Sequence, residues 1–100
     1  MTSIYKNKKE SLKGLKIEME ACRRFAKSSE ERAKERKIGF AIRLLDNAQM
    51  AKECADKAHE ALWELSGGNL TDEEYEIFCD AETLRMDINK AYEAIQRARN

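Results

Sequence analysis

The chain has 100 residues and no net charge, because 19 Lys and Arg balance 19 Asp and Glu. This length is enough for one domain with its own core, but not for a large enclosed substrate cavity. Apolar residues make up 42% of the chain, while proline is absent and only 4 glycines occur, so the composition excludes a disordered chain and favours long helices.

Targeting and redox signals are few. No uncharged stretch approaches the roughly 18 residues that span a bilayer, and residues 1–6 are not followed by the apolar run typical of a signal peptide. Cys22, Cys54 and Cys79 fall on different expected helices. Scattered cysteines in odd number are typical of reduced thiols rather than of a disulfide framework or a zinc site. We therefore expect a cytoplasmic protein with no membrane association, metal or other cofactor.

The first expected helix covers residues 5–27. Its apolar residues recur at steps of three and four, which is the rhythm of a helix with one buried stripe: Leu12, Leu15, Met19, Cys22 and Ala26. No apolar residue follows at the next expected positions, and Ser28 with Glu31 has the spacing of a weak capping box. We predict a short turn at Ser28 and Ser29. One uninterrupted helix through both serines is the alternative.

The second expected helix covers residues 30–65. Its stripe keeps the same rhythm and consists mostly of alanine, which lets a neighbouring helix approach closely: Ala41, Leu44, Ala48, Ala51, Ala55, Ala58, Leu62 and Leu65. Further apolar residues beside the stripe, including Phe40, Leu45 and Trp63, widen this face beyond a two-helix seam. The second helix therefore needs more than one neighbour.

The third expected helix covers residues 72–97. Gly67 suits the left-handed position that closes the preceding helix, and Thr71 with Glu74 forms a capping box for the new one. Its apolar stripe is unbroken: Ile77, Ala81, Leu84, Ile88, Ala91, Ile95 and Ala98. The predicted fold is all-α, a three-helix up-down-up bundle in a single domain over residues 1–100. An elongated helical hairpin that completes its core by dimerising is the alternative, so monomer and homodimer both stay open.

His59 is the one histidine, and Asp56-x-x-His59 has the spacing of the carboxylate and histidine ligands in di-iron helical bundles. Such a site needs a second pair, which a single histidine cannot supply. Cys54 is five residues before His59, about 140° away round a helix, so the two do not form a nucleophile and base pair. We interpret His59 as a polar residue at the edge of an apolar face, and we predict no catalytic residue and no enzyme activity.

Opposite charge divides the chain. Residues 1–45 hold 13 Lys and Arg against 6 Asp and Glu, and residues 46–100 hold 6 against 13. Opposite the first apolar stripe lies a line of cations, here called the basic ridge: Lys9, Lys13, Lys16, Arg23, Arg24 and Lys27. It could follow a phosphate backbone, although Glu20 interrupts it and no aromatic residues interleave to stack on bases. The simplest use of Glu76, Asp80 and Asp87 on the third helix is to meet cations of a neighbouring helix.

Three residues on the third helix lie away from its apolar stripe: Tyr75, Cys79 and Met86. Tyr and Met are favoured at contact surfaces, so we predict that these three form a protein contact patch. The favoured function is a small cytoplasmic interaction protein, an adaptor or inhibitor, of a composition common among mobile-element and phage accessory proteins. The alternative is a nucleic-acid-associated regulator that uses the basic ridge.

Overall fold

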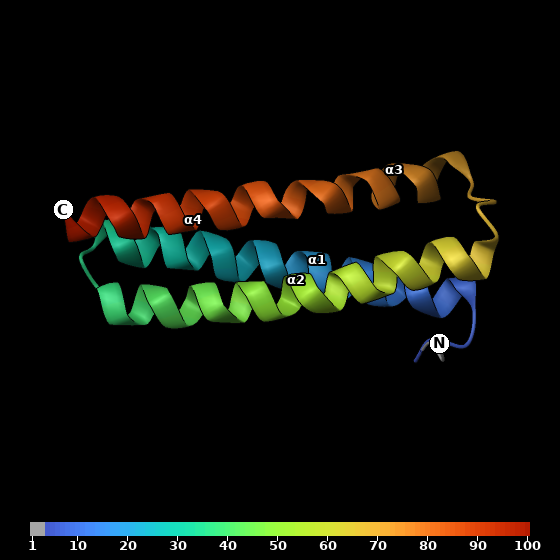
Figure 1. The fold of residues 1–100 in the computed structure, drawn as a ribbon, viewed down its shortest axis with the longest axis horizontal. Coiled ribbons are helices and arrows are strands. Elements are labelled where there is room, and N and C mark those ends of the chain that lie inside the picture. The colour runs from blue at the N-terminus through green and yellow to red at the C-terminus, as the bar shows by residue number, and fades with distance from the viewer. Residues whose placement is uncertain (1–3) are drawn as a thin grey trace.

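The structure is a computed structural model that describes residues 4–100. It consists of α1 (Lys8–Lys34), α2 (Ile38–Ser66), α3 (Asp72–Asp80), a short 3-10 helix η1 (Ala81–Thr83) and α4 (Leu84–Arg99). In Figure 1, α1 and α2 lie side by side, and α3, η1 and α4 follow one another as a third rod along them. The bundle is elongated, with extents of 47 × 25 × 17 Å. The predicted all-α, three-helix bundle is confirmed.

One hydrophobic core joins the three rods. Leu15 of α1, Leu62 of α2 and Leu84 of α4 are its largest fully buried apolar side chains. Between them lies the predicted alanine stripe of α2, which is buried at five positions: Ala41, Ala48, Ala51, Ala55 and Ala58. Small side chains at these positions let the helix backbones approach closely. The stripes predicted on the first and third helices are likewise buried or packed against this core.

The predicted turn at Ser28 and Ser29 is wrong, because α1 continues through both residues to Lys34. Ser29 occupies the stripe position between Ala26 and Ala33 and is fully buried. Its hydroxyl donates a hydrogen bond of 2.6 Å to the Ala41 carbonyl of α2. A buried hydroxyl needs such a partner. Because Ser29 has one, a polar residue can occupy this position in the buried stripe. The first helix therefore ends seven residues later than the predicted 27, and the second begins at Ile38 rather than 30.

The real turn lies at residues 35–37. Arg36 adopts a left-handed backbone conformation with φ 66°, a position usually taken by glycine. The amide of Arg36 donates to the Ala33 carbonyl at 3.0 Å and that of Lys37 to the Arg32 carbonyl at 2.9 Å, which closes the end of α1. The Arg36 side chain donates to the Ala98 carbonyl of α4 at 2.6 Å. A long-range contact therefore supports a conformation that the local sequence does not signal.

The connection to the third rod follows the prediction. Gly67 ends α2 in the left-handed conformation with φ 62°, and Thr71 and Glu74 form both hydrogen bonds of the capping box. The third rod is not one regular helix, because η1 separates α3 from α4. Near this break the Phe78 carbonyl accepts from His59 and the Asp80 carbonyl from the Thr83 hydroxyl. The rod ends at Arg99, two residues beyond the predicted 97.

Candidate protein-interaction surfaces

The predicted contact patch is exposed. Tyr75 is 54% and Met86 56% accessible, and Cys79 is also exposed. Tyr75 and Cys79 are one turn apart on α3, while Met86 follows on α4 beyond η1. A hydrogen bond between the Tyr75 and Cys79 side chains raises the pKa of Tyr75. The structure thus places Tyr75 and Cys79 one turn apart on α3 and leaves all three residues open to solvent.

Aromatic rings support this patch from beneath. Phe78 of α3 stacks on the His59 ring of α2 with a centroid separation of 3.7 Å, and its ring centroid lies 5.3 Å from Trp63 and 6.2 Å from Tyr75. Rings packed in this way hold α3 against the end of α2. Sequence reasoning missed Phe78. Two features of the sequence could have identified Phe78. It follows Ile77 of the apolar stripe, and the second helix has His59 and Trp63 one turn apart as ring partners.

His59 has a structural role. It is half-buried, as expected for a polar residue at the edge of an apolar face. Its Nε2 lies 2.9 Å from the Phe78 carbonyl oxygen, so this nitrogen donates the hydrogen bond. Its ring face is covered by Phe78. Within residues 4–100, no three His, Cys, Asp or Glu side chains gather as ligands for a metal ion.

The structure divides the basic ridge. Arg23 is half-buried and reaches α3, where its guanidinium lies 3.0 Å from the Asp80 carboxylate; it also lies 3.8 Å from Asp87 of α4. This is the contact predicted for Asp80 and Asp87, whereas Glu76 forms no ion pair with any residue from 4 to 100. The rest of the ridge is exposed and forms no ion pair with any residue from 4 to 100: Lys9, Lys13, Lys16, Arg24 and Lys27.

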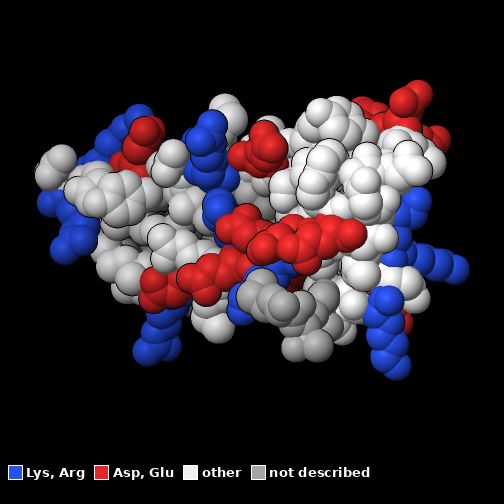
Figure 2. Space-filling model, turned by 45° about the vertical axis from the view of Figure 1, so that its right-hand side comes forward, with Lys and Arg blue, Asp and Glu red and all other residues white. Residues whose placement is uncertain are grey.

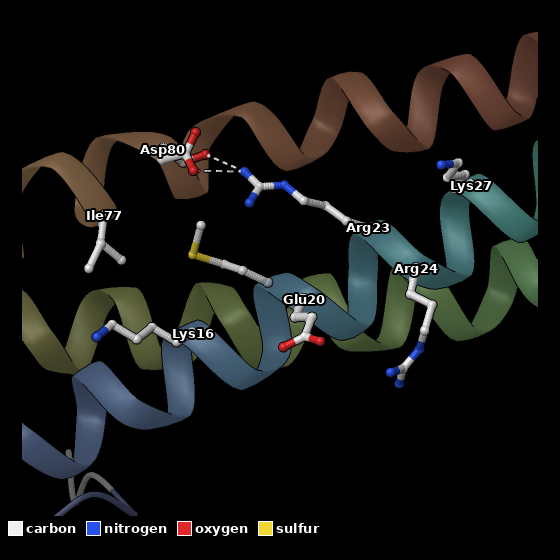
Figure 3. Close-up of a pocket in the computed structure, with 8 residues that line it drawn as sticks. Lys16, Glu20, Arg23, Arg24, Lys27, Ile77 and Asp80 are labelled. Atoms are coloured by element: carbon white, nitrogen blue, oxygen red, sulfur yellow. Dashed lines mark hydrogen bonds and ion pairs between the residues drawn. The ribbon is translucent and has the colours of Figure 1, made fainter.

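A groove that the sequence did not predict lies between α1 and α3. Its volume is about 470 Å³, and its apolar lining comes from Met19 of α1 and Ile77 of α3. Figure 3 shows Ile77 pointing toward α1, and Lys16, Arg24 and Lys27 projecting from α1. The hydrogen bonds from Arg23 to Asp80 cross the space between the two helices (Figure 3). The groove lies where α3, whose residues are all half-buried or exposed, runs beside α1.

Acidic residues gather on another face. Figure 2 shows Asp and Glu side chains in a band across the face turned to the viewer, with Lys and Arg mostly toward its margins. On α2, four exposed carboxylates form no ion pair with a described residue: Asp46, Glu53, Glu60 and Glu64. The opposite charge of the two chain halves is therefore only partly neutralised inside the bundle, by pairs such as Lys8 with Glu74 at 3.1 Å.

The three cysteines differ in environment. Cys22 is fully buried on the core stripe of α1, and burial raises its pKa to about 11. Cys54 on α2 and Cys79 on α3 are exposed, and all three are free thiols. Since the thiolate is the reactive form, Cys22 should be inert in the folded protein while the other two remain accessible.

No protein-family model, curated protein or solved structure matches this chain. None of the helices formed by residues 4–100 has the length and apolar character needed to cross a membrane.

Proposed function

We propose that this chain is a small cytoplasmic interaction protein, an adaptor or inhibitor, that binds another protein through Tyr75, Cys79 and Met86. The observation that carries the proposal is the exposure of Tyr75 and Met86, each more than half accessible, on the outward side of the third rod. Tyr contributes contact area at a low entropy cost, and Met adapts its shape to a partner. The packed rings of Phe78 and His59 hold this surface in place before binding, which reduces the entropy lost on association.

Contact rather than catalysis is proposed for a chemical reason. The His59 ring is stacked on Phe78, and its Nε2 is occupied by a backbone carbonyl. Cys22 is buried with a raised pKa, which disfavours the nucleophilic thiolate. These groups hold the bundle together instead of facing a reaction space.

The proposal is tested by the double substitution Tyr75→Lys with Met86→Lys. We expect the free energy of unfolding to change by less than about 1 kcal/mol, because both side chains are exposed. Affinity for the partner, first captured from the native cell and identified by mass spectrometry, should fall by at least about thirtyfold, because the interface loses apolar area and gains two charges to desolvate.

The chain supplies a matched control, Tyr92→Lys with Met50→Lys. Tyr92 is 53% and Met50 64% accessible, so the same residue types change at similar exposure away from the patch. The control variant should keep its affinity within about threefold, the effect of a neutral position. Equal losses in the two variants, or full binding by the first, would contradict the proposed patch.

The alternative function is nucleic-acid binding along the basic ridge, which is favoured because its cations other than Arg23 are exposed and form no ion pair with residues 4–100. The two functions differ in salt dependence. When binding involves several phosphate contacts, the logarithm of the binding constant falls steeply and linearly with the logarithm of the salt concentration. The affinity of a contact centred on Tyr75 and Met86 should depend only weakly on salt. A titration of the full chain against generic DNA and RNA at several salt concentrations separates them.

A further inference from the structure

The groove between α1 and α3 combines two features that define one class of ligand. Its floor is apolar, formed by buried Met19 and half-buried Ile77. Its rim is cationic, because Lys16, Arg24 and Lys27 line it and none of them pairs with a carboxylate among residues 4–100. Two carboxylates of residues 4–100 line the groove: Asp80, which pairs with Arg23, and Glu20, which does not. A ligand that fits must therefore bring both apolar groups and negative charge.

The shape of this end of the bundle indicates how such a ligand would lie. α4 packs into the core with Leu84, Ile88, Ala91, Ala94 and Ile95, whereas α3 contributes no buried residue. One half of the molecule is thus a closed three-helix bundle, and in the other half the groove lies between α1 and α3, which the ion pairs of Lys8 with Glu74 and of Arg23 with Asp80 join. A further helix laid over the groove would lie across the Arg23–Asp80 pair and cover half-buried Ile77, which gives this half a four-helix arrangement.

We propose that the groove binds an acidic amphipathic helix from another protein. The rim from Lys16 to Lys27 extends about 16 Å along α1, which corresponds to about three turns of a bound helix. Apolar residues on one face of that helix meet Met19 and Ile77, and its flanking Asp or Glu meet Lys16, Arg24 and Lys27. The site shares no residue with the contact patch of Tyr75, Cys79 and Met86, and the proposal does not depend on that patch.

Nucleic acid fits the same groove less well. A single strand binds by stacking its bases on aromatic side chains in a basic channel, and no aromatic residue in the described part of the chain lines the groove. Phosphates would engage the rim but leave half-buried Ile77 at the floor in contact with water. An acidic helix uses both the charge and the apolar surface, so the observations favour it.

The test uses the full chain and a fluorescent synthetic helix of about 18 residues, long enough to span the rim. The probe carries leucine at helical spacing on one face and glutamate beside it. A second probe has lysine in place of every glutamate, and a third is a labelled single-stranded oligonucleotide. Anisotropy should rise with the acidic helix and not with the basic one, and the affinity for the acidic helix should fall as salt is raised.

Two pairs of substitutions separate the groove from the general charge of α1. Lys16→Glu with Lys27→Glu reverses two rim charges, and we expect affinity for the acidic helix to fall by at least about tenfold. Lys9→Glu with Lys13→Glu makes the same change in net charge on the same helix but outside the groove. The affinity of that control variant for the acidic helix should fall by no more than about threefold. Helix content and melting are compared for both variants, whose substituted residues are all exposed.

Each remaining outcome has a defined meaning. The variant Tyr75→Lys with Met86→Lys should bind the acidic helix no more weakly than the native chain, so failure of the contact patch and failure of the groove are distinguishable. No binding of the acidic helix, equal binding of the basic helix, or equal losses in the two lysine pairs would overturn the proposal. Tighter binding of the oligonucleotide than of the acidic helix at the same salt would also overturn it, in favour of nucleic acid.

Discussion

Leu84→Ala should lower the free energy of unfolding by about 3 kcal/mol, within the range of about 2–5 kcal/mol for a buried leucine. Leu84 is fully buried at the point where η1 passes into α4, and it is one of the three largest fully buried apolar side chains of the core. Its removal leaves a cavity between the third rod and the pair formed by α1 and α2. Urea denaturation followed by circular dichroism measures the effect.

The control for this substitution is Met86→Ala, two residues further along the same helix. Met86 is 56% accessible, so its loss should cost no more than about 0.5 kcal/mol. A small effect at Leu84, or a large one at Met86, would mean that the third rod is rotated relative to the arrangement described above. The assignment of Met86 to an outward patch would then fail as well.

Ser29→Leu should also destabilise the bundle strongly, by about 3 kcal/mol. Ser29 has no exposed surface, and its hydroxyl lies 2.6 Å from the Ala41 carbonyl, so the backbones of α1 and α2 leave no room for a larger side chain. Overpacking costs about 1–3 kcal/mol, and the lost hydrogen bond adds about 1 kcal/mol. Ser29→Ala, which removes only the hydrogen bond, should fall between Ser29→Leu and the native chain.

The neighbouring Ser28 provides the comparison. It is half-buried, and its hydroxyl forms no hydrogen bond with another side chain or backbone group of residues 4–100, so Ser28→Ala should change the free energy of unfolding by no more than about 0.5 kcal/mol. If residues 28 and 29 formed an exposed turn, both serines would tolerate substitution equally. Equal tolerance in thermal and urea unfolding would therefore contradict the continuous α1.

Local signals explain which parts of the fold could be predicted. The end of α2 at Gly67 and the start of α3 at Thr71 and Glu74 depend on residues within one turn of each other, and both were predicted. The turn after α1 depends on contacts far apart in the sequence. The Ser29 hydroxyl donates to the Ala41 carbonyl, and the Arg36 guanidinium donates to the Ala98 carbonyl. The residues next to Ser29 and Arg36 in the sequence therefore do not indicate these roles.

The candidate surfaces divide in the same way. Helical periodicity was enough to place Tyr75, Cys79 and Met86 on an exposed side, because it depends only on spacing within one rod. The stack of Phe78 on His59 and the groove between α1 and α3 depend on how α3 packs against α1 and α2. That placement involves η1, which the heptad rhythm of the third helix did not indicate.

The contact patch is tested most directly by the cysteines of the native chain. The full protein is treated with N-ethylmaleimide at neutral pH, alone and saturated with its captured partner, and each alkylation rate is measured by mass spectrometry. Cys54 is exposed outside the patch, and Cys22 is buried with its pKa raised to about 11, so they serve as the accessible and inaccessible controls. We predict that the partner protects Cys79 and leaves the rate at Cys54 unchanged, while Cys22 stays unmodified throughout. Alkylation of Cys79 at its free rate in the saturated complex would contradict binding through Tyr75, Cys79 and Met86.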